Sequence, residues 1–159
     1  MVILGIDPGS NRIGIGIIEK KSGRAEKKDA FLLTDENAFK DDEGRRLLNM
    51  EEKLNAVLKK TKPHAAAIET LFFSKNKKTA FSVAQARGVI LKTLAERNIP
   101  VIELSPNQIK SYVTGNGSAS KKEVAKMVGY FLSTDVNGLI DDVTDALAAA
   151  IAASFICKK

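Results

Sequence analysis

Four acidic residues at three separated places in the chain could together bind a metal ion. Asp7 and Glu69 each end a short apolar run, and Asp142 and Asp145 open an Ala-rich segment near the C-terminal end. An isolated charge on an apolar element is costly unless it is paired or bound to a metal. Carboxylate oxygens are the ligands that Mg²⁺ prefers in proteins. The four residues therefore predict a magnesium site, provided that the fold brings them together.

Each of these residues also has a purely structural interpretation. Asp7 stands before a Pro-Gly turn and could form an Asx-turn, and Glu69 could be an exposed strand end. For Asp141 alone, simple capping and helix-start chemistry is the accepted interpretation. Asp145 follows Asp142 by three residues, which places both on one helix face. Capping does not explain a charge one turn inside a helix, so the metal-site interpretation is favoured.

The predicted chemistry is hydrolysis of a phosphodiester bond. Clustered carboxylates repel one another and partly protonate without a cation. Two Mg²⁺ ions would relieve this repulsion, one activating a water and the other stabilising the leaving 3′ oxygen. We expect Mn²⁺ to be able to substitute. This mechanism needs no His or Cys nucleophile, so His64 is interpreted as a surface residue.

Composition narrows the class of protein. The 159 residues fit one compact domain, expected to span residues 1–159. The formal net charge of +6 favours a polyanionic partner such as nucleic acid. Cys157 is the single cysteine, which excludes an internal disulfide. With neither a signal-peptide pattern nor an apolar stretch long enough for a bilayer, we expect a cytoplasmic protein without a membrane partner.

Hydrophobic periodicity predicts alternating strands and helices. Residues 2–6 form a nearly continuous apolar run that is typical of a buried strand. From residue 13 to 17, Ile alternates with Gly, which predicts a strand with one face packed tightly against another backbone. Further strands are expected over residues 24–34, 65–69 and 100–104. Helices are expected over residues 43–60, 79–98 and 120–132. Two more helices should begin at residue 106 and at residue 141 or 142.

This order of elements predicts an α/β fold. We expect a five-stranded mixed sheet, in which an antiparallel meander precedes parallel strands, with helices on both faces. The strands that carry Asp7 and Glu69 should be parallel neighbours. Their carboxyl ends would then lie side by side, at the edge where an open α/β sheet normally places its site.

One loop interleaves aromatic and basic residues. Phe72 and Phe73 are followed by Lys75, Lys77 and Lys78. Aromatic rings stack on unpaired bases, and lysines hold phosphates. We expect Phe72 and the three lysines to contact nucleic acid and Phe73 to lie in the core. The alternative is that the lysines are merely solvated.

Further basic residues are candidates for DNA contact. Lys121 and Lys122 lie in the first turn of a predicted helix, where positive charge is unfavourable to the helix dipole. With the preceding Gly117-Ser118 loop they form a predicted phosphate site, unless they serve solubility alone. Lys110 is a weaker candidate. Arg87 lies inside a helix and could instead make a structural hydrogen bond.

The helix predicted over residues 79–98 has two apolar faces. Phe81 and Val89 lie nearly opposite the main apolar face. This second face packs either on a partner subunit or under a loop of the same chain. The main face comprises Ala80, Val83, Ala84, Ile90, Leu91 and Leu94.

Five motifs lie along nearly the whole chain. They are Gly5-Ile6-Asp7-Pro8-Gly9-Ser10, Ala67-Ile68-Glu69, Gln85-Ala86-Arg87-Gly88, Gly117-Ser118-Ala119 and the segment from Asp142 to Ala148. Together they resemble the bacterial RuvC Holliday-junction resolvase family. The opening motif is shared by many RNase H-like proteins. The loop over residues 72–76 and the Gln-Ala-Arg-Gly motif make the resemblance specific.

The resemblance implies an RNase H-like fold and a homodimer that nicks two strands of a four-way DNA junction symmetrically, in homologous recombination and DNA repair. It also implies a bacterial cytoplasmic enzyme that partners the RuvA–RuvB branch-migration complex. The positions that match functional residues of the family are the catalytic Asp7, Glu69, Asp142 and Asp145, the base-stacking Phe72, and the DNA-contacting Lys110 and Lys121.

The sequence departs from the family pattern in two places. Residues 11–13 lack the Thr that often precedes Gly in the opening motif. Asp141 adds a carboxylate, so either Asp141 or Asp142 could ligate metal. The three-residue spacing to Asp145 favours Asp142.

Three other functions fit parts of the sequence. The opening motif also occurs as a phosphate loop in sugar-kinase or actin-like ATPases, but those proteins need two such domains and this chain has room for one. Residues 11–14 slightly favour another RNase H-like nuclease, acting on RNA–DNA hybrids or structured RNA. A catalytically silent junction-binding protein is disfavoured by the complete acidic set.

Overall fold

A single mixed sheet forms the centre of the molecule. The computed structural model describes residues 1–10, 12–34, 42–70, 77–136 and 138–157. The sheet has five strands in the order β3-β2-β1-β4-β5. The strands are β1 (Val2–Pro8), β2 (Arg12–Lys21), β3 (Arg24–Thr34), β4 (Ala65–Glu69) and β5 (Val101–Leu104).

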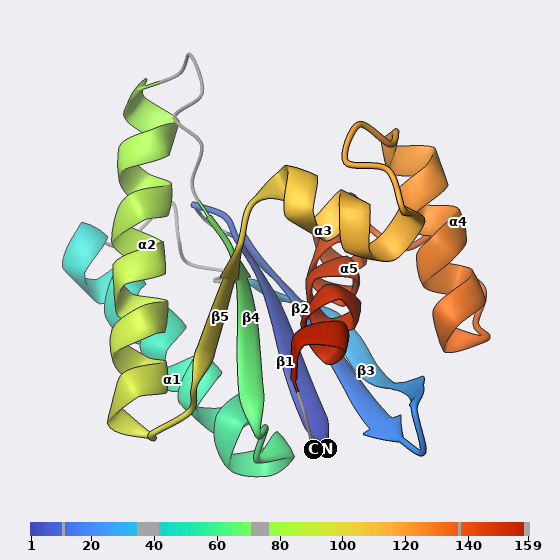
Figure 1. Cartoon of the computed structure of the whole chain (residues 1–159). Helices are drawn as coiled ribbons and strands as arrows, with labels where there is room; N and C mark the ends of the chain where they lie inside the picture. The colour runs from blue at the N-terminus through green and yellow to red at the C-terminus, as the bar shows by residue number, and fades with distance from the viewer. Residues whose placement is uncertain (11, 35–41, 71–76, 137, 158–159) are drawn as a thin grey trace.

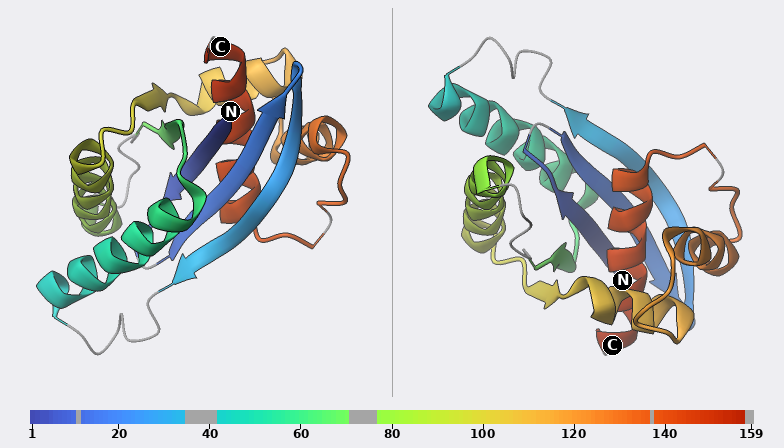
Figure 2. Two further views of the ribbon diagram at one scale, coloured as in Figure 1. Left: turned by 90° about the horizontal axis from the view of Figure 1, so that it is seen from below. Right: turned by 90° about the horizontal axis from the view of Figure 1, so that it is seen from above.

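Helices cover both faces of this sheet, as predicted. They form a layer on each face, with the last helix running along the strands (Figures 1 and 2). Each layer has its own apolar cluster against the sheet. Every helix in the described ranges is too short or too polar for a membrane span. The helices are α1 (Glu43–Thr61) and α2 (Lys77–Glu96) on the first face, and α3 (Pro106–Thr114), α4 (Lys121–Leu132) and α5 (Asp141–Ile156) on the second.

The central strand β1 joins the two halves of the sheet. It pairs antiparallel with β2 and parallel with β4, which confirms the predicted topology. In the parallel register Ile6 lies beside Ile68. Because the next residues are Asp7 and Glu69, both acidic side chains fall at the same edge of the sheet.

Local capping fixes where several helices begin. The Asp42 side chain accepts a hydrogen bond from Arg45 N at 2.9 Å and caps α1. Ser120 and Glu123 form a capping box at the start of α4. Ser105 forms a second capping box with Gln108 at the start of α3. Each cap satisfies backbone N–H groups that a helix start leaves without partners.

Two predicted boundaries were wrong by a few residues. The second helix spans Lys77–Glu96 rather than 79–98. It ends early because the chain turns at Asn98, which has a left-handed φ of 54°. The first strand extends through Pro8, so Asp7 lies within β1, paired with Gly14, rather than after its end.

The apolar faces of α2 also differ from the prediction. Ala86, Ile90 and Leu94 are fully buried against the sheet. Ala84, which we assigned to the core face, is exposed. Phe81 is 66% exposed, so the intramolecular loop cover considered for this face is wrong for this residue.

Glycines in β1 and β2 let α5 approach the sheet backbone to backbone. A Cβ at Gly5 would overlap the carbonyl oxygen of Ala146, and one at Gly16 would lie 2.6 Å from Leu147 N. A Cβ at Gly14 would overlap the carbonyl oxygen of Asp142. The tight packing predicted from the Ile-Gly alternation is therefore confirmed.

Replacing Gly5 with Ala should destabilise the protein by about 3 kcal/mol or more, because overpacking in a filled core forces the backbone to shift. Urea unfolding followed by circular dichroism measures this change. Gly44→Ala is the matched control. The nearest atom to its Cβ is the exposed Asp42 carboxylate at 3.3 Å, and Ala is favoured over Gly in a helix. Equal stability of both variants would contradict close packing at Gly5.

Candidate active site

Three elements bring the four predicted acidic residues to one edge of the sheet. Asp7 comes from β1, Glu69 from β4, and Asp142 and Asp145 from the first turns of α5. The other three carboxylates all act electrostatically on Asp7. The predicted convergence of these distant positions is therefore confirmed.

Burial and mutual repulsion disfavour the charged forms in this cluster. Burial, followed by the charges of Asp145 and the other carboxylates, raises the pKa of Asp7 from 3.8 to about 7. Burial and the nearby Asp145 charge raise the pKa of Glu69. Burial also raises the pKa of Asp145, against the opposing effect of Lys121. Cations should bind favourably to such a cluster, because they offset the repulsion among its carboxylates.

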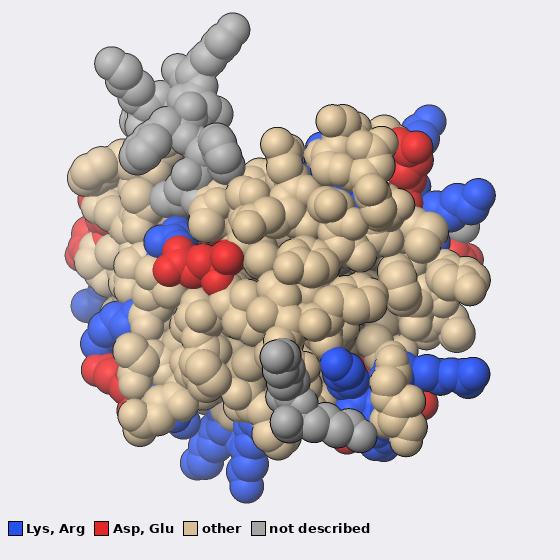
Figure 3. Space-filling view, viewed as in Figure 1, with Lys and Arg blue, Asp and Glu red and all other residues tan. Residues whose placement is uncertain are grey.

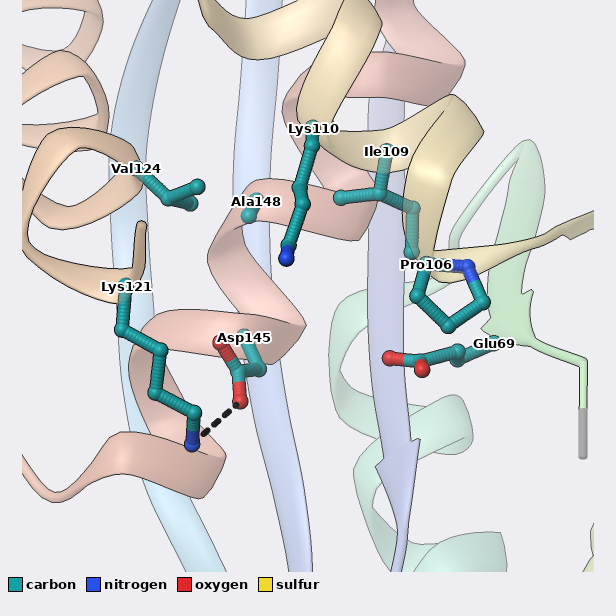
Figure 4. A pocket seen from close by; sticks show the side chains of 8 residues that line it. All are labelled: Glu69, Pro106, Ile109, Lys110, Lys121, Val124, Asp145 and Ala148. Atoms are coloured by element: carbon teal, nitrogen blue, oxygen red, sulfur yellow. Dashed lines mark ion pairs between the residues drawn. The ribbon is translucent and has the colours of Figure 1, made fainter. Parts of the chain in front are cut away.

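Part of the cluster lines an open pocket with a volume of about 210 Å³ (Figure 4). Glu69 and Asp145 point into it from opposite sides, and Lys110 and Lys121 reach in from α3 and α4. Apolar side chains, including Ile109, line the remainder. The pocket therefore combines carboxylates with cations that could receive a phosphate.

Lys121 bridges the first turn of α4 to α5. Its Nζ atom lies 3.3 Å from an Asp141 oxygen and 3.6 Å from an Asp145 oxygen. The charge of Asp145, more than any other effect, raises the pKa of Lys121. Lys121 thus stays protonated near neutral pH.

Asp141 lies in the first turn of α5, as its helix-start interpretation predicts, but it is not the capping residue. Ile140 is the N-cap of α5 and makes no side-chain capping bond, whereas the Asp141 side chain is exposed and pairs with Lys121. Asp142, and not Asp141, is among the charges that act on Asp7. This geometry favours Asp142 over Asp141 as the member of the cluster.

Sequence reasoning missed Arg12. Its Nε atom lies 3.4 Å from an Asp142 oxygen, so a residue at the start of β2 reaches the first turn of α5. In the sequence, Arg12 is one of many charged residues and follows a turn, so no local pattern distinguishes it. The Gly14 contact with the α5 backbone, which fixes this proximity, is a tertiary feature.

The donor set fits Mg²⁺ by its chemistry, although no three-ligand cage is preformed. Across the described ranges, no group of three or more His, Cys, Asp or Glu side chains is arranged around one ion position. Mg²⁺ usually keeps several waters and is held by one or two carboxylates together with substrate phosphates. Pairs of these carboxylates therefore suit an ion whose coordination the substrate completes.

The remaining predicted residues fall into three groups. Phe72, Phe73 and Lys75 lie outside the described residues. Lys77 and Lys78 belong to the first turn of α2, and Lys122 is exposed in the first turn of α4. His64 is an exposed residue, as predicted, and its Nδ1 accepts a hydrogen bond from Val2 N at 3.1 Å. Arg87 pairs with Glu103 of β5, which supports its structural interpretation.

The fold and the acidic edge together define a class: a metal-dependent nuclease of the RNase H-like fold. Residues 3–153 match the family model for crossover junction endodeoxyribonuclease RuvC. The chain therefore belongs to the RuvC family, whose nucleases are metal-dependent.

Individual relatives agree with this assignment. The chain is 44% identical to the RuvC crossover junction endodeoxyribonuclease of Carboxydothermus hydrogenoformans over 96% of its own length and 94% of the relative. The corresponding protein of Petrotoga mobilis is also 44% identical, over 94% and 91% of the two chains.

Solved structures show the same architecture. T. thermophilus RuvC in complex with Holliday junction substrate matches with a TM-score of 0.90 and 30% identity, covering 98% of this chain and 94% of that one. The yeast mitochondrial Holliday junction resolvase Ydc2 matches with a TM-score of 0.67 at 15% identity, covering 96% and 78% of the two chains, which shows the fold.

Replacing Asp7 with Asn should stabilise the metal-free protein at neutral pH. The pKa of Asp7 is about 7 in the folded protein against an ordinary 3.8, so the folded state binds this proton more tightly than the unfolded chain does. The free energy of unfolding of the natural chain should therefore rise as the pH falls from about 8 to about 5. The variant should lack this pH-dependent change in the free energy of unfolding, which amounts to about 2–4 kcal/mol.

Urea unfolding in EDTA at several pH values tests this prediction. Asp29→Asn, which changes an exposed carboxylate on β3, is the control and should leave the pH profile unchanged. Added Mg²⁺ should stabilise the natural chain more than the Asp7→Asn variant, because a ligand stabilises the state that binds it. A variant that is less stable than the natural chain at pH 8 would contradict the electrostatic description of the cluster.

Proposed function

We propose that the chain is a structure-selective endonuclease that resolves four-way DNA junctions by paired symmetric nicks, in homologous recombination and DNA repair. The observation that carries the proposal is the acidic cluster from two parallel strands and the start of α5, beside an open pocket that two lysines also line. Membership of the RuvC family and the likeness to a RuvC bound to junction DNA support the choice of substrate. The activity resides in the single RNase H-like domain of residues 1–159.

Asp7, Glu69, Asp142 and Asp145 are the catalytic residues, and they act as metal ligands. Bound Mg²⁺, with two ions per site and Mn²⁺ as a substitute, would supply an activated water and stabilise the leaving 3′ oxygen. The carboxylates hold their oxygens at the sheet edge and exclude other anions from it until a cation is present. Their mutual repulsion favours cation binding over an empty site.

Lys121 and Lys110 position the scissile phosphate. Both reach into the pocket that Glu69 and Asp145 line, Lys110 from α3 and Lys121 from α4 (Figure 4). Lysine is protonated near neutral pH, and the Asp145 charge raises the pKa of Lys121 further, so Lys121 can exchange this carboxylate for a phosphate oxygen as a cation.

The surface around the pocket holds the DNA. Phe72 stacks on a base near the junction centre, and Lys75, Lys77 and Lys78 hold adjacent phosphates. Lys122 extends the basic surface along the first turn of α4. The chain's net charge of +6 supports this polyanionic substrate.

The enzyme works as a homodimer through the outer face of α2. Two coordinated nicks in a junction of approximate two-fold symmetry require two sites related by the same operator, which a symmetric dimer supplies. Phe81, 66% exposed on this face, is the central contact. In the bacterial cytoplasm the dimer cooperates with the RuvA–RuvB branch-migration complex.

Asp145→Asn should abolish Mg²⁺-dependent cutting and retain junction binding, because the change removes a ligand charge and keeps the side-chain shape. The control is Glu52→Gln, an exposed position on α1. The assay compares a mobile four-way junction, a linear duplex and an RNA–DNA hybrid of equal length, with Mg²⁺ or EDTA. Preferential cutting of the hybrid would overturn the assignment of the substrate, and unchanged cutting by the variant would remove Asp145 from the mechanism.

Phe81→Asp should convert the dimer to monomers, since a charge at the centre of an apolar contact is desolvated without a partner. Sedimentation velocity at micromolar protein concentration measures the change. Leu48→Asp, at a 51% exposed Leu on α1, is the matched control and should remain dimeric. Monomeric natural protein, even on junction DNA, would refute the dimer.

A further inference from the structure

A second hollow lies at the opposite end of the sheet from the acidic cluster. It has a volume of about 570 Å³ and is bordered by the β2–β3 hairpin and the C-terminal ends of α4 and α5. We call it the hairpin groove; the residues that matter here are Lys20, Arg24, Glu26, Tyr130, Phe131 and Phe155. Its volume is in the range of small-ligand and peptide side-chain pockets, about 300–1,000 Å³.

The hairpin groove is separate from the catalytic edge. Lys20 hydrogen-bonds the backbone of Met1 at the start of β1, whereas Asp7 pairs with Gly14 near the other end of the same strand. Six residues of extended strand correspond to about 20 Å. A ligand in the hairpin groove would therefore leave the acidic pocket open.

Aromatic side chains give this groove an apolar wall. Tyr130 is 74% exposed and Phe155 is 53% exposed. The Phe155 ring stacks on Tyr112 with 6.3 Å between centroids and meets Phe131 edge-on at 5.7 Å. These contacts hold the ring in place, so the wall is preorganised for a ligand.

Among the described residues, neither Lys20 nor Arg24 forms an ion pair with a carboxylate, and Glu26 also lines the groove. Lys20 Nζ donates to the carbonyl oxygens of Ser154 at 2.5 Å and Cys157 at 3.4 Å, which are uncharged partners. Within the described part of the chain no ion pair involves Arg24. The nearby Glu19 is already engaged by Lys21 and Lys28.

On the face shown in Figure 3, Lys and Arg side chains border a mostly uncharged surface at the lower right, over the β2–β3 hairpin and the ends of α4 and α5. The uncharged surface includes the aromatic wall of the groove, and cations border it. This pattern is complementary to a ligand that has an apolar group next to negative charge.

We propose that the hairpin groove binds a short acidic peptide segment that carries a bulky apolar side chain. The apolar side chain packs among Tyr130, Phe131 and Phe155, and the carboxylates pair with Lys20 and Arg24. This assignment goes beyond the nuclease function and would give the enzyme a docking surface for a protein partner while DNA occupies the other end of the sheet.

A peptide suits this groove better than DNA does. Duplex DNA is held by a dense row of cations along the phosphate backbone, whereas Lys20 and Arg24 share the groove with the carboxylate of Glu26. A hollow with fixed aromatic rings is instead suited to one or more inserted side chains, which duplex DNA does not offer.

The test is fluorescence anisotropy with a labelled hexapeptide, Asp-Asp-Glu-Asp-Leu-Phe. Two control peptides replace either the acidic residues with Lys or the Leu-Phe pair with Ser-Gly. The acidic apolar peptide should bind saturably, and each control peptide should bind at least about tenfold more weakly, since both kinds of contact contribute.

Variants of the protein assign the binding to the groove. Arg24→Glu and Tyr130→Ala should each weaken binding by about tenfold. Their matched controls on the opposite layer, Lys59→Glu and Leu48→Ala, should bind as the natural chain does. All four variants should fold and cut the four-way junction normally, because these exposed side chains lie away from the acidic edge.

Three results would overturn the proposal. They are the absence of saturable binding by the acidic apolar peptide, equal binding of all three peptides, and unchanged binding by both groove variants. Weaker junction binding by Arg24→Glu would instead assign the groove to DNA. A lower sedimentation coefficient of this variant than of the natural chain would assign the groove to a second copy of the chain. Either outcome would also reject the acidic peptide as the ligand of the groove.

Discussion

The close approach of α5 to the sheet is the constraint on which the rest of the structure depends. Gly5, Gly14 and Gly16 provide no Cβ atoms where the helix backbone crosses β1 and β2. This contact allows the Ala-rich helix to bury most of its length. It also sets the distance from the first turn of α5 to the end of β1, and thus places two acidic residues of the helix above Asp7.

The same packing creates an electrostatic cost. Partial burial raises the pKa of three carboxylates at the edge, so the folded chain concentrates negative charge that the unfolded chain would disperse. Arg12 and Lys121 offset part of this repulsion by pairing with the two ends of the acidic turn of α5. A site whose charges repel one another is suited to cation binding, and we expect the same charges to lower the stability of the metal-free fold.

The sheet separates chemically different regions. One end carries carboxylates and lysines around the candidate catalytic pocket, and the opposite end carries the aromatic and cationic hairpin groove. The outer face of α2 presents Phe81 on a third side. Since these regions do not share residues, DNA, a second subunit and a peptide could bind without competing for the same atoms.

The sequence alone determined the order of strands and helices, the parallel pairing of β1 with β4, and the identity of the four clustered acidic residues. These features follow from hydrophobic periodicity and from charges at the ends of apolar runs, which are properties of consecutive residues. The sequence also indicated tight packing through the Ile-Gly alternation. The pairing of Arg12 with Asp142, the role of Asp141 as a partner of Lys121, and the exposure of Ala84 were decided by tertiary structure. Each of these three features depends on how far one element is rotated and shifted against its neighbour. Side-chain packing across the whole core fixes this relative position, and no local sequence pattern does.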